Sequence, residues 1–199
     1  MANIYGKYNS FDEVVEEVKK IEKEKRFNHS LGVVKVAEDL AKLNNYDVDK
    51  AKLGAILHDC AKNLSDERIE EFCKENNLDF SYLNDYPSIL HSHLGYYYAK
   101  IEFGIDDEEL LLAIKYHTTG HENMTLLEKI IYLADFLDPG RDTTNYQENF
   151  DKAKDLSYTN IDEGLKFVLQ RTMFYLDLKG VNNIHPDTKK AYDYYVFNN

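Results

Sequence analysis

The chain has 199 residues, of which 43% are hydrophobic and 30% charged, enough to build one core under a polar surface. There are 36 acidic against 24 basic residues, and the net charge of −12 disfavours nucleic acid because phosphate backbones are repelled. Two cysteines are too few for a disulfide framework, and no apolar stretch has membrane-spanning length. The first residues lack the pattern of a signal peptide. We therefore expect a cytoplasmic protein that binds neither nucleic acid nor membranes.

Apolar residues recur at helical spacing along the chain, while Gly and Pro number only 9 and 3, so we predict an all-α fold. Capping signals mark the starts of the helices. Three capping boxes are predicted, namely Ser10 with Glu13, Asp106 with Glu109, and Thr125 with Glu128; Asp47, Ser65 and Asn160 are the other predicted N-caps. Helices are predicted over about 11–21, 26–44, 48–58, 66–75, 88–101, 107–117, 126–137, 161–178 and 186–197.

Two segments lack a clear helical period. Residues 77–87 are predicted to form a loop or short turns, and residues 142–159 a polar linker. We expect one domain over 1–199, with an N-terminal helix within 1–24 and C-terminal helices over 160–199 packed on it. The aromatic segment Tyr192–Phe197 is expected to pack on the body of the protein.

Histidines and aspartates near the ends of the predicted helices indicate a metal site. His58 and Asp59 end one apolar helix, and His29 precedes the apolar stripe of another. Asp135 lies in an apolar helical run, where a core-facing carboxylate needs an ionic partner or a metal. Two imidazoles and two carboxylates suit iron, manganese, cobalt or a similar divalent ion better than a closed thiolate zinc site.

Two other histidines are predicted to lie outside this site. His117 and His121 do not form a metal-binding pair at i and i+4, because Gly120 breaks the helix between them. His185 precedes a proline in a predicted loop. We expect His121 and His185 to be ordinary packing or surface residues.

The order His29, His58-Asp59 and Asp135 resembles the metal-binding signature of the HD-domain phosphohydrolases. Later blocks resemble one branch, the bacterial YqeK-type symmetrical bis(5′-nucleosyl)-tetraphosphatases, and the likeness spans about residues 26–188. These blocks are His91 with Gly95, His117-Thr118-Thr119-Gly120, the run from Met124 to Asp135, and Asp138-Pro139-Gly140-Arg141. Two positions depart from the branch: Asp138 stands where a glutamate is usual, and His93 where a non-histidine residue is more common.

The resemblance implies an HD-domain helical bundle that hydrolyses diadenosine tetraphosphate symmetrically into two ADP molecules, by attack of a metal-activated water. It implies one metal ion, iron first and manganese, cobalt or another divalent metal next, with room for a second. The implied metal ligands are His29, His58, Asp59 and Asp135. The implied catalytic residues are Asp59, Lys62, His91 and His117. The implied substrate-binding residues are Arg26, Lys62, His91, His117, Thr118 and Arg141, with the basic side chains and protonated His91 or His117 supplying positive charge.

Other functions remain open at this point. The chain could hydrolyse a mononucleotide or an alarmone-like pyrophosphate, and product analysis would separate these from symmetrical cleavage. A catalytically silent HD module that binds a nucleotide or a partner helix is a second class, which metal content and chelation would test. A DNA-binding protein is disfavoured by the net charge of −12. The expected ligand is a dinucleoside polyphosphate or nucleoside diphosphate, and the chain is expected to be a monomer or homodimer.

Overall fold

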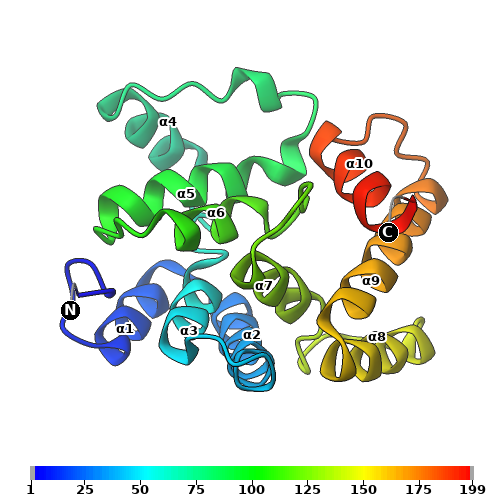
Figure 1. Ribbon diagram of the computed structural model, residues 1–199. Coiled ribbons are helices and arrows are strands. Elements are labelled where there is room, and N and C mark those ends of the chain that lie inside the picture. The colour runs from blue at the N-terminus through cyan, green and yellow to red at the C-terminus, as the bar shows by residue number, and fades with distance from the viewer. Residues whose placement is uncertain (1–2, 198–199) are drawn as a thin grey trace.

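The computed structural model describes residues 3–197, which are largely helical and contain no strand (Figure 1). The predicted all-α class is confirmed. The α-helices are α1 (Phe11–Ile21), α2 (Glu24–Leu43), α3 (Val48–Leu57), α4 (Asp66–Glu75), α5 (Leu90–Glu102), α6 (Glu108–Tyr116), α7 (Leu126–Phe136), α8 (Gln147–Thr159), α9 (Ile161–Leu178) and α10 (Pro186–Tyr192). Short turns of 3₁₀ type span Ser81–Leu83 and Pro87–Ile89, and a π-helical turn spans Asp193–Phe197.

Most of the predicted N-caps accept a hydrogen bond from the first turn of their helix. The side chains of Asp47, Ser65 and Asn160 cap α3, α4 and α9. Thr125 and Glu128 form the predicted reciprocal capping box of α7. These starts were predictable because the capping residue and its partner lie within four positions of each other.

Two of the three predicted capping boxes are wrong in detail. Ser10 caps α1, but the carboxylate of Glu13 binds the backbone N–H of Asn9 instead of that of Ser10. In α6 the N-cap is Asp107, one residue later than predicted. The carboxylates of both Asp107 and Glu109 contact the Lys50 ammonium, at 2.8 and 2.7 Å.

The predicted polar linker over 142–159 is also wrong, because most of it forms α8. The buried positions of α8 are few, namely Phe150, Ala153 and Ser157, yet they lie on one face at spacings of three and four. This face packs against α9 and α2. The apolar stripe was too sparse to be recognised without those partners.

Helix α7 lies in the middle of the molecule, where it contacts α2, α3, α6 and α9 (Figure 1). It is apolar on nearly all sides, as expected of a central helix. Its fully buried residues are Leu127, Ile130, Ile131, Leu133 and Ala134. One end of this rigid helix carries Asp135, so the core fixes the position of that carboxylate.

The C-terminal segment packs on the body through Tyr195, as predicted for the aromatic end. Tyr195 is buried, and its hydroxyl oxygen accepts a 2.6 Å hydrogen bond from the backbone N–H of Met124. Phe197 is 71% exposed and takes no part in this packing. Within residues 3–197, no helix is long and apolar enough to cross a lipid bilayer.

Candidate active site and metal centre

Three histidines are held so that the same ring nitrogen, Nε2, faces a common point. His58 lies just after α3, and its Nδ1 contacts the Ala55 carbonyl oxygen at 2.6 Å. His117 lies just after α6, and its Nδ1 contacts the Ile114 carbonyl oxygen at 2.7 Å. Because each carbonyl can only accept, Nδ1 carries the hydrogen and Nε2 presents a lone pair, the arrangement usual for metal-ligating histidines.

The third of these histidines, His29, lies in the second turn of α2. Its Nδ1 is 2.7 Å from a carboxylate oxygen of Asp138, a residue that follows α7. Its Nε2 is 3.1 Å from Asp135 Oδ1 and 4.0 Å from Asp59 Oδ2. His29 therefore presents Nε2 toward both aspartates that the sequence predicted as metal ligands.

Asp59 is at the centre of the cluster, and its two oxygens face different groups. Oδ2 is 3.4 Å from His58 Nε2 and 2.6 Å from Arg26. Oδ1 is 3.2 Å from His91 Nε2 and 3.5 Å from His117 Nε2. One buried carboxylate thus joins two groups of side chains that come from four separate segments of the chain.

The cluster fits a divalent cation. His29 Nε2, His58 Nε2 and Asp59 Oδ1 are buried and have no hydrogen-bond partner among the described residues. Such atoms are costly to bury unless something binds them. The sets His29–His58–Asp59, His58–His117–Asp135 and Asp59–His91–His117 each place their ligand atoms within 4.8 Å of one another. Nitrogen and carboxylate donors in this number suit a first-row divalent metal.

The electrostatics of the cluster favour a positive charge at this point. Burial by itself lowers the pKa of His58, but the adjacent Asp59 carboxylate outweighs burial and raises that pKa to about 9. Burial likewise opposes protonation of His29, yet Asp135 and Asp138 raise its pKa. Burial alone would raise the pKa of Asp135, whereas His29 and Arg141 lower it.

His91 differs from the other histidines. Burial lowers its pKa to about 4, which disfavours the protonated form of the ring near pH 7. Positive charge at this place comes from Lys62, whose Nζ is 2.9 Å from His91 Nδ1. The hydroxyl oxygen of Thr118 lies 3.1 Å from His117 Nε2 and 3.4 Å from His91 Nε2.

The two predicted arginines lie beside the two aspartates. Arg26 lies one turn before His29 on α2 and donates to Asp59 Oδ2. Arg141 donates to both the side-chain carboxylate and the backbone carbonyl of Asp135. The structure therefore brings together all ten residues that the sequence predicted for metal, catalysis or substrate. Among these residues, Arg26, His29 and Arg141 line one cavity, whose lining does not include Lys62.

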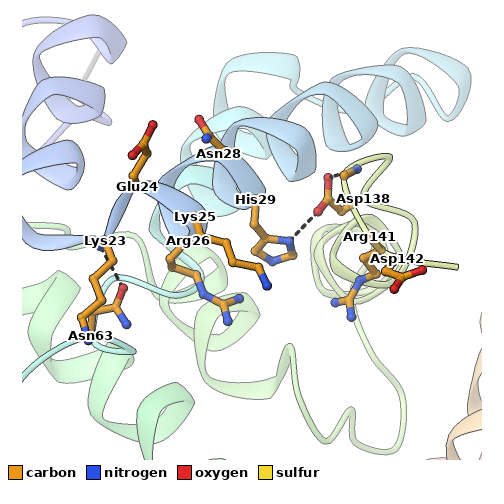
Figure 2. A pocket seen from close by; sticks show the side chains of 11 residues that line it. Lys23, Glu24, Lys25, Arg26, Asn28, His29, Asn63, Asp138, Arg141 and Asp142 are labelled. Atoms are coloured by element: carbon orange, nitrogen blue, oxygen red, sulfur yellow. Dashed lines mark hydrogen bonds and ion pairs between the residues drawn. The ribbon is translucent and has the colours of Figure 1, made fainter.

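That cavity has a volume of about 780 Å³ and lies between the start of α2 and the loop after α7 (Figure 2). His29 forms its floor toward the metal cluster. Around it, the side chains of Lys25, Arg26 and Arg141 point into the space between these segments. The complete lining is Lys23, Glu24, Lys25, Arg26, Asn28, His29, Asn63, Asp138, Gly140, Arg141 and Asp142.

Sequence reasoning missed the contact of Asp138 with His29 and the position of Lys25 in the cavity lining. Asp138 was noted only as an exchange for glutamate, yet it is buried and orients His29. Gly32 makes this approach feasible, since a Cβ there would lie 1.9 Å from Asp138 Oδ1. The signal for Lys25 was its spacing of four from His29, which puts both on one face of α2.

The remaining histidines lie outside the cluster. His93 faces away from His91, and its Nδ1 is 3.0 Å from the Tyr82 hydroxyl. His121 contacts Glu128 at 2.8 Å, and His185 caps α10 by accepting from the N–H of Asp187. As predicted, His121 and His185 have local structural partners.

A sequence model described as "HD domain" matches residues 26–140, the segment that contains all four predicted metal ligands, His29, His58, Asp59 and Asp135. The chain belongs to the HD-domain family. A protein of Halalkalibacterium halodurans named "Bis(5′-nucleosyl)-tetraphosphatase, symmetrical" is 39% identical to this HD-domain chain, over 85% of the chain and 88% of the relative. A protein of Bacillus subtilis with the same name is 34% identical, over 87% and 90%.

A solved structure supports the same assignment at the level of the fold. A Clostridium acetobutylicum protein, described as a predicted HD superfamily hydrolase involved in NAD metabolism, superposes with a TM-score of 0.83 at 36% identity. The alignment covers 94% of this HD-domain chain and 97% of the other. The resemblance drawn from the sequence to the HD-domain fold and to the symmetrical tetraphosphatase branch is confirmed.

Proposed function

We propose that this HD-domain chain is a metal-dependent hydrolase that cleaves a dinucleoside tetraphosphate at its central phosphoanhydride, converting diadenosine tetraphosphate into two ADP molecules. The observation that carries the proposal is the convergence of unpartnered buried donor atoms around Asp59, in a chain similar to two symmetrical tetraphosphatases over most of its length. The family places the chemistry in the hydrolase class, and the cluster supplies groups suited to it.

His29, His58, Asp59 and Asp135 would hold the cation, and iron is the ion we propose, with manganese and cobalt as the next choices for the same nitrogen and oxygen donors. Such an ion supplies a nucleophile by lowering the pKa of a water, and it offsets phosphate charge. A second ion at Asp59, His91 and His117 would require Lys62 to move, since its ammonium lies 2.9 Å from His91.

The chain's own residues position and neutralise the tetraphosphate. Lys62 brings a full positive charge beside His91, and Thr118 offers a hydroxyl donor at the same side of Asp59. On the other side, Arg26 and Arg141 are within reach of the same centre and can bind phosphate oxygens by charge-assisted hydrogen bonds. Fixed donors of this kind stabilise the charge that develops as the bridging oxygen leaves.

The proposed reaction forms one bond and breaks one. A water oxygen bonds to one of the two central phosphorus atoms, and the bond from that phosphorus to the central bridging oxygen breaks. Asp59 can receive the proton that the water loses, because its carboxylate is held at the centre by His58, His91 and His117. The departing bridging oxygen then belongs to the second nucleoside diphosphate.

Product analysis tests the proposal. The protein as purified is incubated with diadenosine tetraphosphate, with and without a chelator, and the nucleotides are separated by chromatography. ADP as the sole product, lost on chelation and regained with Fe²⁺ or Mn²⁺, is the expected result. AMP with ATP would establish asymmetric cleavage and overturn the assignment, and turnover unaffected by chelation would remove the metal from the mechanism.

A further inference from the structure

Central cleavage of a tetraphosphate places a diphosphate on each side of the broken bond, so the site needs two phosphate-binding surfaces. This premise rests on the proposed function. The arrangement around Asp59 supplies two such surfaces. On the Oδ1 side are His91 with the Lys62 ammonium and the Thr118 hydroxyl. On the Oδ2 side are Arg26 and the cavity floored by His29.

The cavity carries more positive charge than its surroundings in a chain of net charge −12. Lys25, Arg26 and Arg141 reach into it from two segments that are far apart in sequence (Figure 2). Of its three carboxylates, Asp138 is bonded to His29 and Asp142 accepts hydrogen bonds from Thr144. The third carboxylate is Glu24, and the lining holds four basic side chains, Lys23, Lys25, Arg26 and Arg141, against these three.

Lys25 is an exposed residue in the first turn of α2. Among the described residues its ammonium makes no ion pair, and it lies one turn before His29 on the same face of α2. Lys25 lines the cavity from α2, and Arg141 and Asp142 line it from the loop after α7. A lysine in this position is available to a phosphate that bridges the two walls.

The far end of the cavity is fixed by the loop that follows the His58–Asp59 pair. The side-chain oxygen of Asn63 accepts a 2.9 Å hydrogen bond from the backbone N–H of Lys23, which ties that loop to the start of α2. A volume of about 780 Å³ is within the range of small-molecule sites and exceeds what a diphosphate alone needs. Apart from the imidazole of His29, no aromatic ring is among the described residues that line it.

We propose that this cavity is the half-site for one diphosphate of the substrate, that Lys25 is a phosphate ligand in it beside Arg26 and Arg141, and that it recognises phosphate without recognising the base. A base is ordinarily held by stacking on an aromatic face, and the lining offers none to the outer nucleoside. Phosphate oxygens are matched by the lysine and the two arginine forks.

The proposal extends the substrate class to nucleoside 5′-tetraphosphates, which lack the second nucleoside. Adenosine 5′-tetraphosphate would place adenosine on the Lys62 side and two free phosphates in the cavity. Water then forms a bond to one central phosphorus while the central bridging bond breaks, and the products are ADP and pyrophosphate. The stoichiometry uses one water and no other reactant.

The matched test compares Lys25→Ala with Lys35→Ala. Both lysines are exposed on α2, both variants lose the same charge, and Lys35 lies ten residues, about 15 Å, further along the helix axis. For Lys25→Ala we expect KM for diadenosine tetraphosphate to rise about five- to tenfold, the scale of one solvent-accessible charge-assisted contact, with Lys35→Ala near wild type. Equal KM values for the two variants would overturn the assignment of Lys25.

Two further readouts complete the test. Wild-type protein is expected to convert adenosine 5′-tetraphosphate to ADP and pyrophosphate with a kcat/KM within about tenfold of that for the dinucleotide. A loss beyond a hundredfold would show that the outer nucleoside is recognised and would refute that part. Calorimetric binding of pyrophosphate, weakened in Lys25→Ala alone, tests the cavity without turnover. Pyrophosphate binding of that kind together with no cleavage of diadenosine tetraphosphate would reject the proposed function and retain the half-site.

Discussion

Replacing Gly32 by alanine tests whether the approach of Asp138 to His29 sets the quality of the metal centre. In an ordinary helix interior this exchange is favourable by about 1 kcal/mol, because alanine is the better helix former. Here the added Cβ would lie 1.9 Å from Asp138 Oδ1 and 3.0 Å from its Cγ, with Pro139 Cδ at 3.5 Å behind them. The Asp138 carboxylate therefore has to move to make room for the alanine, and this movement offsets the higher helix propensity of alanine.

The cost follows from the contacts that Asp138 would lose. Its hydrogen bonds to His29 Nδ1, 2.7 Å, and from the backbone N–H of Gly140, 2.9 Å, both depend on its present position. Loss of a carboxylate that orients a ligating histidine typically weakens metal binding about 10- to 100-fold, or about 1.4–2.7 kcal/mol. We expect Gly32→Ala to weaken metal binding by an amount within that range. At limiting metal concentration, kcat/KM should decrease in proportion.

The assay is an equilibrium titration of metal-free protein with Co²⁺, followed by visible absorption, with thermal unfolding of the same samples. Gly54→Ala is the matched control: it is also a helical glycine, but its added Cβ would meet the mobile end of Ile131 at 3.2 Å and is remote from Asp138. Wild-type Co²⁺ affinity in Gly32→Ala would refute the reasoning, because Asp138 would then have no influence on the ligand set.

Three shorter predictions concern other parts of the molecule. Asp59→Ala abolishes turnover and bound metal while the far-ultraviolet circular dichroism stays helical, whereas the exposed Asp155→Ala is unaffected; near-normal rates would remove Asp59 from the mechanism. Burial raises the pKa of Glu22 to about 7, so its contribution to stability is lost as the pH rises from about 4.5 through 7. The free energy of unfolding of Glu22→Gln, measured with urea, should therefore increase relative to that of the wild type by up to about 3 kcal/mol between pH 4.5 and 8. A difference that does not change with pH would contradict this. Chelation should lower the Tm of the wild type and leave that of Asp59→Ala unchanged.

Local signals explain how much of the fold was predictable. Asp47 and Thr125 act within one turn of the backbone they cap, so their helices began where the sequence indicated. Helix α8 was missed because its stripe of Phe150, Ala153 and Ser157 becomes recognisable only against α9 and α2. The predicted Asp106 box is one residue out of register, and the residues concerned, Asp107 and Glu109, both pair with Lys50, which lies on another helix.

The candidate site was likewise predictable only where the signal is local in the sequence. The proximity of His29, His58, Asp59 and Asp135 was predictable from the sequence, because their order along the chain resembles that of the HD-domain proteins. The spacing of Lys25 from His29 indicated a shared helix face, but the cavity between Lys25 and Arg141, and the contact of Asp138 with His29, depend on the loop after α7 lying beside the start of α2. The sequence likewise gave no indication that the two carboxylate oxygens of Asp59 face different groups, because this depends on the tertiary structure.

The anchoring of His58 and His117 has a consequence for how the centre assembles. Each ring is bound to the carbonyl three residues earlier, one of the helix-end carbonyls that lack an intrahelical partner. Two imidazoles are thus oriented by four-residue segments as soon as α3 and α6 form, and little of their rotamer entropy remains to be lost when a cation arrives. His29 is oriented by Asp138, 109 positions away, so the last ligand to be ordered is the one that depends on the completed fold.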